Sequence, residues 1–202
     1  MAVRTIIPGP PGTGKTLLAV QAAVKLFKEG KVDKIIVTRP AVSVDEDLGF
    51  LPGTLEQKMA PWTRPIFDVL REYFNAREIE GMIEEGIIEI APLAYMRGRT
   101  LSHSFVILDE SQNTTKEQMK MFLTRMGRDA KFAITGDVSQ VDLPRQQMSG
   151  LLYAQRNLKD IEGIGMVQLT GEDVVRHRLV RAVIHAFEVA DAAQHDSPRT
   201  KY

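Results

Sequence analysis

The feature that most constrains this chain is the segment spanning residues 9–16, which reads Gly-Pro-Pro-Gly-Thr-Gly-Lys-Thr. It matches the phosphate-binding pattern G-x-x-x-x-G-K-[ST] at every specified position. A short apolar run from Val3 to Ile7 precedes it and a helical pattern follows it, which is the context the pattern requires. Such a loop turns successive backbone N–H groups toward one anion, and the helix behind it adds the positive end of its dipole. The sequence therefore predicts that the chain binds a nucleoside triphosphate.

The loop also predicts a role for individual side chains. Lys15 is expected to reach the β- and γ-phosphates, and the hydroxyl of Thr16 to ligate Mg²⁺. A Gly/Pro-rich turn between a strand and a helix is the alternative interpretation, and the match at all fixed positions disfavours it. The predicted nucleotide-binding residues are Gly9, Pro10, Pro11, Gly12, Thr13, Gly14, Lys15 and Thr16.

Composition narrows the class of protein without identifying a partner. The 202 residues suit one domain, and 26 basic against 26 acidic side chains give no general argument for a nucleic-acid or membrane surface. Cysteine is absent, which excludes disulfides and thiolate metal sites. We find no signal peptide and no apolar run of about 20 residues, so we expect a cytoplasmic protein without a membrane span. Because the first strand begins almost at Met1, we also expect the chain to be part of a longer protein.

Apolar runs and helical patterns alternate along the chain. This alternation predicts a mainly parallel sheet covered by helices on both faces, which is a three-layer α/β domain. We expect that domain over residues 1–191, with a surface insertion at about 41–100 and a polar, disordered tail at 192–202. Strands are predicted at 3–7, 34–38, 86–90, 105–108, 131–135 and 166–169, and helices after the loop, from Pro65, after a capping box of Thr114 and Glu117, over 145–158, and around 179–187.

Polar residues follow two of the predicted strands. Asp109 and Glu110 come directly after the strand 105–108, where one carboxylate could hold Mg²⁺ through water and the other polarise an attacking water. Gln140 lies just beyond the strand 131–135 and could detect the γ-phosphate by a hydrogen bond. The alternative for that segment is a turn in which Asp137 accepts a local backbone hydrogen bond.

Longer stretches resemble a known family. Asp109-Glu110-Ser111-Gln112 resembles the Asp-Glu-x-Gln motif of superfamily-one helicases, and Gly136-Asp137-x-x-Gln140 resembles their third motif. Thr38-Arg39-Pro40, the run from Leu48 to Gly53 and the run from Pro92 to Thr100 are similar to the PhoH-like (phosphate-starvation-inducible) ATPase family. The likeness extends from Ile6 to about Ala190.

The resemblance implies a RecA-like ATPase domain with ATP and Mg²⁺ as cofactors. Asp109 would be a metal ligand, and Lys15, Glu110 and Gln140 would act in catalysis, with Glu110 as general base. Preference for ATP over GTP rests on analogy, mildly supported by the absence of the GTPase motif Asn-Lys-x-Asp.

Two further expectations concern partners. Arg176 lies in a stretch similar to the family's late arginine motif, so we expect it to act as an arginine finger across a subunit interface of a homo-oligomer, of which a hexameric ring is one form. In the alternative, Arg176, Arg178 and Arg181 lie on the solvent-exposed face of a terminal helix. A rim for single-stranded RNA is expected from Arg39, Arg64, Arg97 and Arg99, against the alternative of ordinary solvated charges.

The chain is thus predicted to be an ATPase that acts on RNA, helicase-like or RNA-remodelling. Two other functions stay open. One is a nucleotide-controlled module that docks a protein partner and hydrolyses slowly. The other is a P-loop phosphotransferase, which Glu110 and Gln140 disfavour because they suit a water nucleophile.

Overall fold

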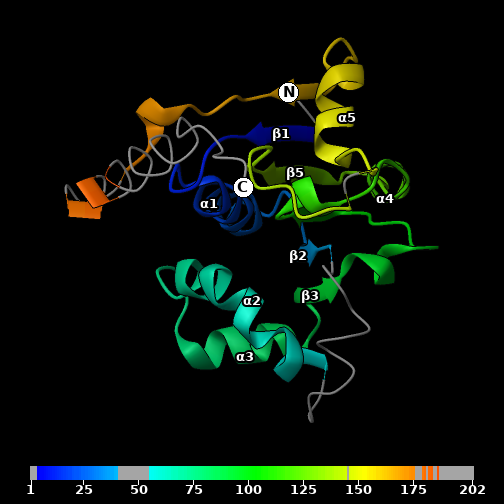
Figure 1. The fold of residues 1–202 in the computed structure, drawn as a ribbon. Coiled ribbons are helices and arrows are strands. Elements are labelled where there is room, and N and C mark those ends of the chain that lie inside the picture. The colour runs from blue at the N-terminus through cyan, green and yellow to red at the C-terminus, as the bar shows by residue number, and fades with distance from the viewer. Residues whose placement is uncertain are drawn as a thin grey trace, which may run out of the picture.

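A computed structural model describes residues 4–40, 55–144, 146–175, 179–180, 182–183 and 186, with the backbone alone over 55–62. Six parallel strands form one sheet in the order β3-β2-β4-β5-β1-β6 (Figure 1). The strands are β1 (Arg4–Pro8), β2 (Lys34–Arg39), β3 (Ile88–Pro92), β4 (Ser104–Leu108), β5 (Lys131–Gly136) and β6 (Ile164–Met166). The helices are α1 (Lys15–Lys28), α2 (Leu55–Leu70), α3 (Ala76–Glu84), α4 (Lys116–Leu123) and α5 (Gly150–Leu158), with short 3₁₀ turns η2 (Leu93–Met96), η3 (Ser111–Asn113) and η4 (Gly171–Asp173).

The strands alternate their buried side chains between two cores, because successive residues of a strand point to opposite faces. On one face, Ile35, Val37 and Ile107 pack with α1, α2 and α3. On the other face, Ile36, Val106 and Ile134 pack with η2, α4 and α5. The expected three-layer α/β architecture with a parallel sheet is confirmed, and every strand pair in the sheet is parallel.

Several element boundaries differ from the sequence predictions. α2 runs through Pro65 instead of beginning there, because Ile66, Val69 and Leu70 are buried in the core shared with α1 and packing outweighs the local start signal. α5 begins at Gly150, later than the predicted residue 145, which lies outside the described residues. β3 is displaced by two residues from the predicted range 86–90.

The last strand starts earlier than predicted. β6 spans Ile164–Met166, and the N–H groups of Val167 and Leu169 continue the parallel pattern by donating to Ile6 and Pro8 at 2.9 Å. The segment after β6 therefore follows β1 toward the phosphate loop.

The insertion contributes directly to the sheet. Its described part holds α2, α3 and the edge strand β3, which pairs with β2. Residues 41–54 and the tail 192–202 lie outside the described residues. Of the predicted terminal stripe, Leu179, Val180 and Val183 are described, and all three are exposed. Within the described part of the chain, no helix has both the length and the apolar character needed to cross a bilayer.

Candidate nucleotide site at the carboxyl edge of the sheet

The phosphate loop connects β1 to α1 at the carboxyl edge of the sheet. Gly12 and Gly14 have φ values of 82° and 77°, which side chains with a Cβ rarely adopt, so glycine is required for the curl of the loop. Gly14 is the N-cap of α1 and the helix begins at Lys15, so the loop leads directly into a helix N-terminus, where backbone N–H groups have no acceptor within the helix. This backbone has the form of an anion-binding site.

Side chains of the loop brace it internally. Thr13 Oγ1 donates to the carbonyl of Pro10 at 2.9 Å, and Lys15 Nζ donates to the carbonyls of Gly9 and Pro10 at 2.7 and 2.8 Å. The ammonium group therefore lies over the loop, where it could donate a hydrogen bond to a phosphate oxygen. The predicted position of Lys15 fits a phosphate ligand.

Asp109 joins the loop to the middle of the sheet. It follows β4, is almost fully buried, and its Oδ1 accepts hydrogen bonds from Thr16 Oγ1 at 3.0 Å and from Thr135 Oγ1 at 2.6 Å. An ionised carboxylate can only accept hydrogen bonds, so the Thr16 hydroxyl must be the donor in this bond. The lone pairs of its oxygen therefore stay available to a cation. Thr16 and Asp109, each predicted from the sequence as a metal ligand, are thus joined by a hydrogen bond although they are 93 positions apart in the chain.

These residues fit a Mg²⁺ ion that arrives with a nucleotide. In the part of the chain described, no group of three or more His, Cys, Asp or Glu side chains is placed to hold a metal. A cation at Thr16 would take its remaining ligands from phosphate and water, as Mg²⁺ usually does. Asp137 Oδ2 is also buried at this edge without a hydrogen-bond partner among the described residues.

Glu110 has a strained backbone. Its φ of 53° and ψ of 36° place it in the left-handed region, which a non-glycine residue rarely occupies. His103 and Asp129, at the amino edge of the sheet, also have a positive φ, so the conformation alone does not mark the site. Its Oε2 accepts a 2.7 Å hydrogen bond from Gln112 Nε2, and the Oε1 of Gln112 in turn accepts from the backbone N–H of Asp137 at 3.0 Å. The chain of bonds links Glu110 to the loop after β5.

That loop is a turn closed by Asp137. Its Oδ1 accepts from the backbone N–H and the hydroxyl of Ser139 at 2.9 and 2.7 Å, as the turn alternative predicted. Gln140, the residue directly after Ser139, has an exposed side chain. Its position at the carboxyl edge is compatible with the predicted γ-phosphate contact.

The four arginines predicted to form an RNA rim do not cluster. Arg39 donates through Nε to Asp109 Oδ2 at 3.1 Å and through Nη2 to the same oxygen, so it belongs to the nucleotide site. Arg99 forms a two-pronged pair with Glu89, whose hydrogen bonds raise the pKa of the guanidinium above its usual value. Arg64 and Arg97 are exposed, but Arg64 lies on α2, over one face of the sheet, and Arg97 follows η2, over the other.

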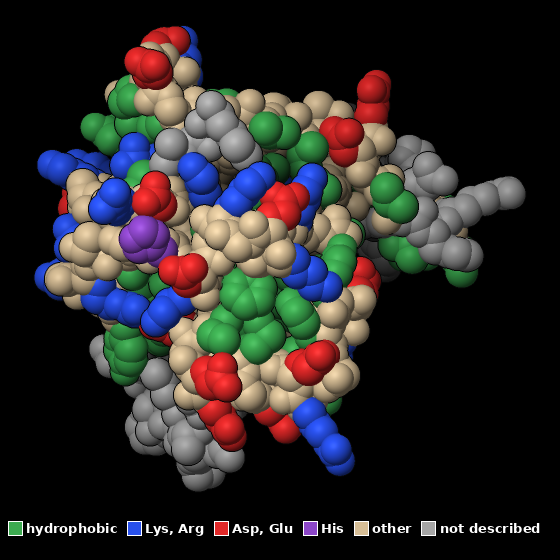
Figure 2. Space-filling view, turned by 180° about the vertical axis from the view of Figure 1, so that it is seen from behind, with side chains coloured by type: hydrophobic (Ala, Val, Ile, Leu, Met, Phe, Trp, Pro, Cys, Tyr) green, Lys and Arg blue, Asp and Glu red, His purple; other side chains and the backbone are tan. Residues whose placement is uncertain are grey.

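Other basic side chains gather away from this edge. Figure 2 shows Lys and Arg side chains around His103, the one histidine among the described residues, which directly precedes β4. His103 therefore marks the amino edge of the sheet, opposite to the phosphate loop.

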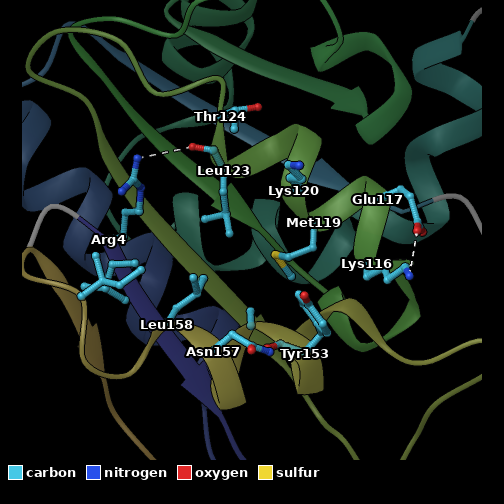
Figure 3. Close-up of a pocket in the computed structure, with 13 residues that line it drawn as sticks. Arg4, Lys116, Glu117, Met119, Lys120, Leu123, Thr124, Tyr153, Asn157 and Leu158 are labelled. Carbon is cyan, nitrogen blue, oxygen red and sulfur yellow. Dashed lines mark hydrogen bonds and ion pairs between the residues drawn. The ribbon is translucent and has the colours of Figure 1, made fainter.

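A cavity in the described part of the chain is also remote from the phosphate loop. It has a volume of about 620 Å³ and lies between α4 and α5, with Arg4 and Ile164 from the first residues of β1 and β6 at one end. Figure 3 shows Arg4 directed across it toward the carbonyl of Leu123, a contact of 3.4 Å. Since none of its lining residues belongs to the loop or to the segment after β4, this cavity is not the nucleotide site.

Two residues of the site were not predicted in these roles. Arg39 was placed among RNA contacts, and the bond from Gln112 to Glu110 was not anticipated. A basic residue at the end of a strand beside the one that carries Asp109 was the available signal for Arg39. The predicted finger Arg176 lies outside the described residues, although its neighbour Val175 donates from its backbone N–H to the carbonyl of Gly12 at 3.2 Å.

A phosphate loop on a parallel sheet, with Asp109 bonded to Thr16, defines a nucleotide-binding protein of the P-loop ATPase type. The family model described as PhoH-like protein matches residues 3–188, and the chain belongs to this family. It is 58% identical over 180 residues to a PhoH-like protein of Bacillus subtilis, covering 89% of this chain and 56% of that protein. It is 46% identical over 181 residues to Protein PhoH of Escherichia coli K12, covering 89% of this chain and 51% of that protein.

The chain thus spans about half the length of the curated relatives it matches. Among solved structures, it is similar to the SWI2/SNF2 ATPase core of Sulfolobus solfataricus in complex with dsDNA, with 17% identity and a TM-score of 0.40. That likeness covers 67% of this chain and 28% of the other, which is too partial to bear on function.

Proposed function

We propose that this chain is the catalytic core of a Mg²⁺-dependent ATPase. The observation that carries the proposal is the 3.0 Å hydrogen bond between Thr16 and Asp109, which joins the phosphate loop to the carboxyl end of β4. It leaves the lone pairs of the Thr16 oxygen available to a cation, and Glu110, the residue after Asp109, lies at the same edge of the sheet. A turn without nucleotide chemistry would not require this contact between segments so far apart in the chain.

In this mechanism, Lys15 and the N–H groups of the loop bind the phosphates. Mg²⁺, when bound at Thr16, would offset charge on the phosphate oxygens. Glu110 accepts the proton of the attacking water, and the hydrogen bond from Gln112 fixes the orientation of its carboxylate. Gln140 would contact the γ-phosphate from the turn after β5.

Two variants test the proposal. Lys15→Ala should abolish tight ATP binding, because Lys15 meets charge that the bound nucleotide already carries. Glu110→Gln should keep binding and lose turnover, because Glu110 acts only on the water. Lys25→Ala, an exposed lysine of the same helix, is the matched control and should change neither quantity. An equal loss of ATP affinity in the Lys15 and Glu110 variants would show that Glu110 is not the general base.

The same assays separate the rival functions. A phosphotransferase would release less inorganic phosphate than ADP when an acceptor molecule is present. A nucleotide-controlled binding module would retain ATP through many minutes without product. Multiple turnovers that yield equal amounts of ADP and phosphate support the ATPase.

We further propose that the ATPase acts on single-stranded RNA. Tyr95, 57% exposed, and the exposed Arg97 both follow the carboxyl end of β3, at the sheet edge that carries the nucleotide site. An exposed aromatic ring beside a cation is a common arrangement for stacking a base and neutralising its phosphate. This pair replaces the four-arginine rim as the proposed contact.

The proposed arginine finger now has two possible sources. A finger from a neighbouring subunit of a homo-oligomer would complete the site from outside. The hydrogen bond between Val175 and Gly12, however, holds the residue before Arg176 against the phosphate loop of its own chain. We therefore favour a role for Arg176 within its own chain, and homo-oligomerisation is retained only as the alternative.

A further inference from the structure

The carboxylate of Asp109 has all of its hydrogen-bond acceptor sites in use. Two carboxylate oxygens offer about four lone-pair positions. Thr16 and Thr135 donate to Oδ1, and Nε and Nη2 of Arg39 donate to Oδ2. Thr135 has a second acceptor in the carbonyl of Leu108, but that contact is longer, at 3.4 Å against 2.6 Å. A cation can therefore contact Asp109 directly only by displacing one of these donors.

Arg39 is the donor that also carries charge. It is the last residue of β2, and the backbone N–H of Asp109 donates to the carbonyl of Thr38 at 3.0 Å, so both side chains leave adjacent strand ends. The side chains of Arg39 and Asp109 are only 16% and 3% exposed. In the described part of the chain, Arg39 forms no ion pair with another carboxylate. Displacing it would separate a poorly hydrated cation from the one carboxylate it pairs with among the described residues, which is unfavourable.

We propose that Arg39 makes metal binding at this site conditional on the nucleotide. By occupying Oδ2 and balancing the carboxylate charge, it keeps the affinity for a free divalent cation low. The metal then binds at Thr16 when the triphosphate brings further negative charge and ligands. Arg39 is thus a positioning residue that acts through Asp109. The inference takes from the proposed function only the location of the metal.

The test measures Mn²⁺ binding to the nucleotide-free protein, with free Mn²⁺ followed by electron paramagnetic resonance. Arg39→Gln removes the charge and should bind Mn²⁺ about tenfold more tightly or better, because the positive charge that repels a cation beside the Asp109 carboxylate is gone. The gain should vanish in Arg39→Gln/Asp109→Asn. Arg39→Lys keeps the charge and should stay close to the parent protein.

Arg99→Gln is the matched control, because it frees the carboxylate of Glu89 from the other two-pronged arginine pair of the sheet. It should leave Mn²⁺ affinity unchanged, whereas a purely structural role for Arg39 would lower thermal stability without increasing Mn²⁺ affinity. Equal Mn²⁺ affinity in Arg39→Gln and the parent would overturn the inference.

If Arg39→Gln does not keep the native circular dichroism spectrum, the inference is tested by Mn²⁺ binding to the parent protein instead. Tight binding of Mn²⁺ alone by the parent, lost in Asp109→Asn, would overturn the inference, and its absence would support it. Because no nucleotide is present, these results do not depend on ATP turnover. Failure to hydrolyse ATP would therefore contradict the proposed function alone.

Discussion

Gln112 Nε2 donates a 2.7 Å hydrogen bond to Oε2 of Glu110, and this bond orients the carboxylate that is proposed to activate water. Gln112 is itself fixed, since it is 1% exposed and its Oε1 accepts from the backbone N–H of Asp137. A general base must lie within hydrogen-bond reach of its proton in a defined orientation. The strained backbone of Glu110 alone does not define that orientation, because its side chain can still rotate.

We expect Gln112→Leu and Gln112→Glu to lower kcat for ATP hydrolysis by about tenfold or more, with little change in ATP affinity. Both variants lose the donor to Glu110, but Gln112→Glu keeps an acceptor for Asp137 and so avoids leaving that N–H unsatisfied. Steady-state kinetics and ATP binding, measured well below the melting temperature, check the prediction. In Glu110→Gln, a further change at Gln112 should have little effect, because the two act as a unit. Unchanged kcat in both single variants would show that the hydrogen bond has no catalytic role.

A second prediction concerns the start of the phosphate loop. A Cβ at Gly9 would lie 2.7 Å from Cβ of Leu169 and 3.0 Å from its carbonyl oxygen, and that backbone is held by its hydrogen bond to Pro8. Gly9→Ala should therefore reduce the free energy of unfolding by about 1–3 kcal/mol. Denaturant unfolding of the nucleotide-free protein measures it.

The control for that substitution is Gly81→Ala in α3, where an added Cβ meets nothing within 4 Å. It should stabilise the protein by about 0.5–1 kcal/mol, because alanine favours the helix. No destabilisation by Gly9→Ala would contradict the close approach of Leu169 to the loop.

The start of α4 yields a third prediction. The capping box consists of Thr115 and Gln118, one residue later than the pair Thr114 and Glu117 predicted from the sequence. Thr115→Ala should cost about 1 kcal/mol of unfolding free energy, as the loss of an N-cap usually does. Glu117→Ala should cost less than Thr115→Ala, because the Glu117 side chain is exposed and the two reciprocal bonds of the capping box run between Thr115 and Gln118. A larger loss in Glu117→Ala than in Thr115→Ala would favour the cap predicted from the sequence.

This one-residue shift shows what local patterns can determine. The sequence prediction named only Thr114 and Glu117, but Thr115 and Gln118 have the same spacing, and spacing alone does not decide between two such pairs. Thr114 proves to be fully buried, with its hydroxyl donating to Ser111, a contact set by packing across η3. The start of α2 was wrongly predicted at Pro65 because packing again outweighed a local signal. The core around Ile66 and Leu70 determines where this helix lies.

Some parts of the candidate site could likewise be predicted from the sequence, and others could not. The loop at residues 9–16 and Asp109 could be predicted because strand ends of a parallel sheet meet at one edge. The partners of Arg39, Arg99 and Gln112 could not, because each depends on which side chains face one another across neighbouring segments. Arg99, for example, pairs with Glu89 of the edge strand, so its charge is already balanced by a carboxylate.

The proposed RNA contact leads to a fourth prediction. Tyr95→Ala/Arg97→Ala should weaken binding of single-stranded RNA and reduce the slope of log affinity against log salt by about 0.7, the value for one phosphate contact on a single strand. ATP hydrolysis without RNA should be unaffected. The matched control is Tyr73→Ala/Arg71→Ala, an exposed pair after α2 over the other face of the sheet. If the control weakens RNA binding equally, the surface at η2 is not the contact.

A final prediction asks which chain supplies Arg176. Because Val175 donates to Gly12 of its own phosphate loop, we expect Arg176 to serve the ATP site of its own chain. Arg176→Ala should bind ATP nearly as well as the parent but lose about 10³-fold in turnover, as removal of an arginine finger does. The source is tested by mixing Lys15→Ala with Arg176→Ala under conditions that allow subunits to exchange. A finger in trans would restore activity, because a mixed interface joins the intact loop of one subunit to the intact arginine of the other. We expect no recovery even where exchange of labelled subunits is demonstrated, and recovered ATPase would instead establish an oligomer with a shared site.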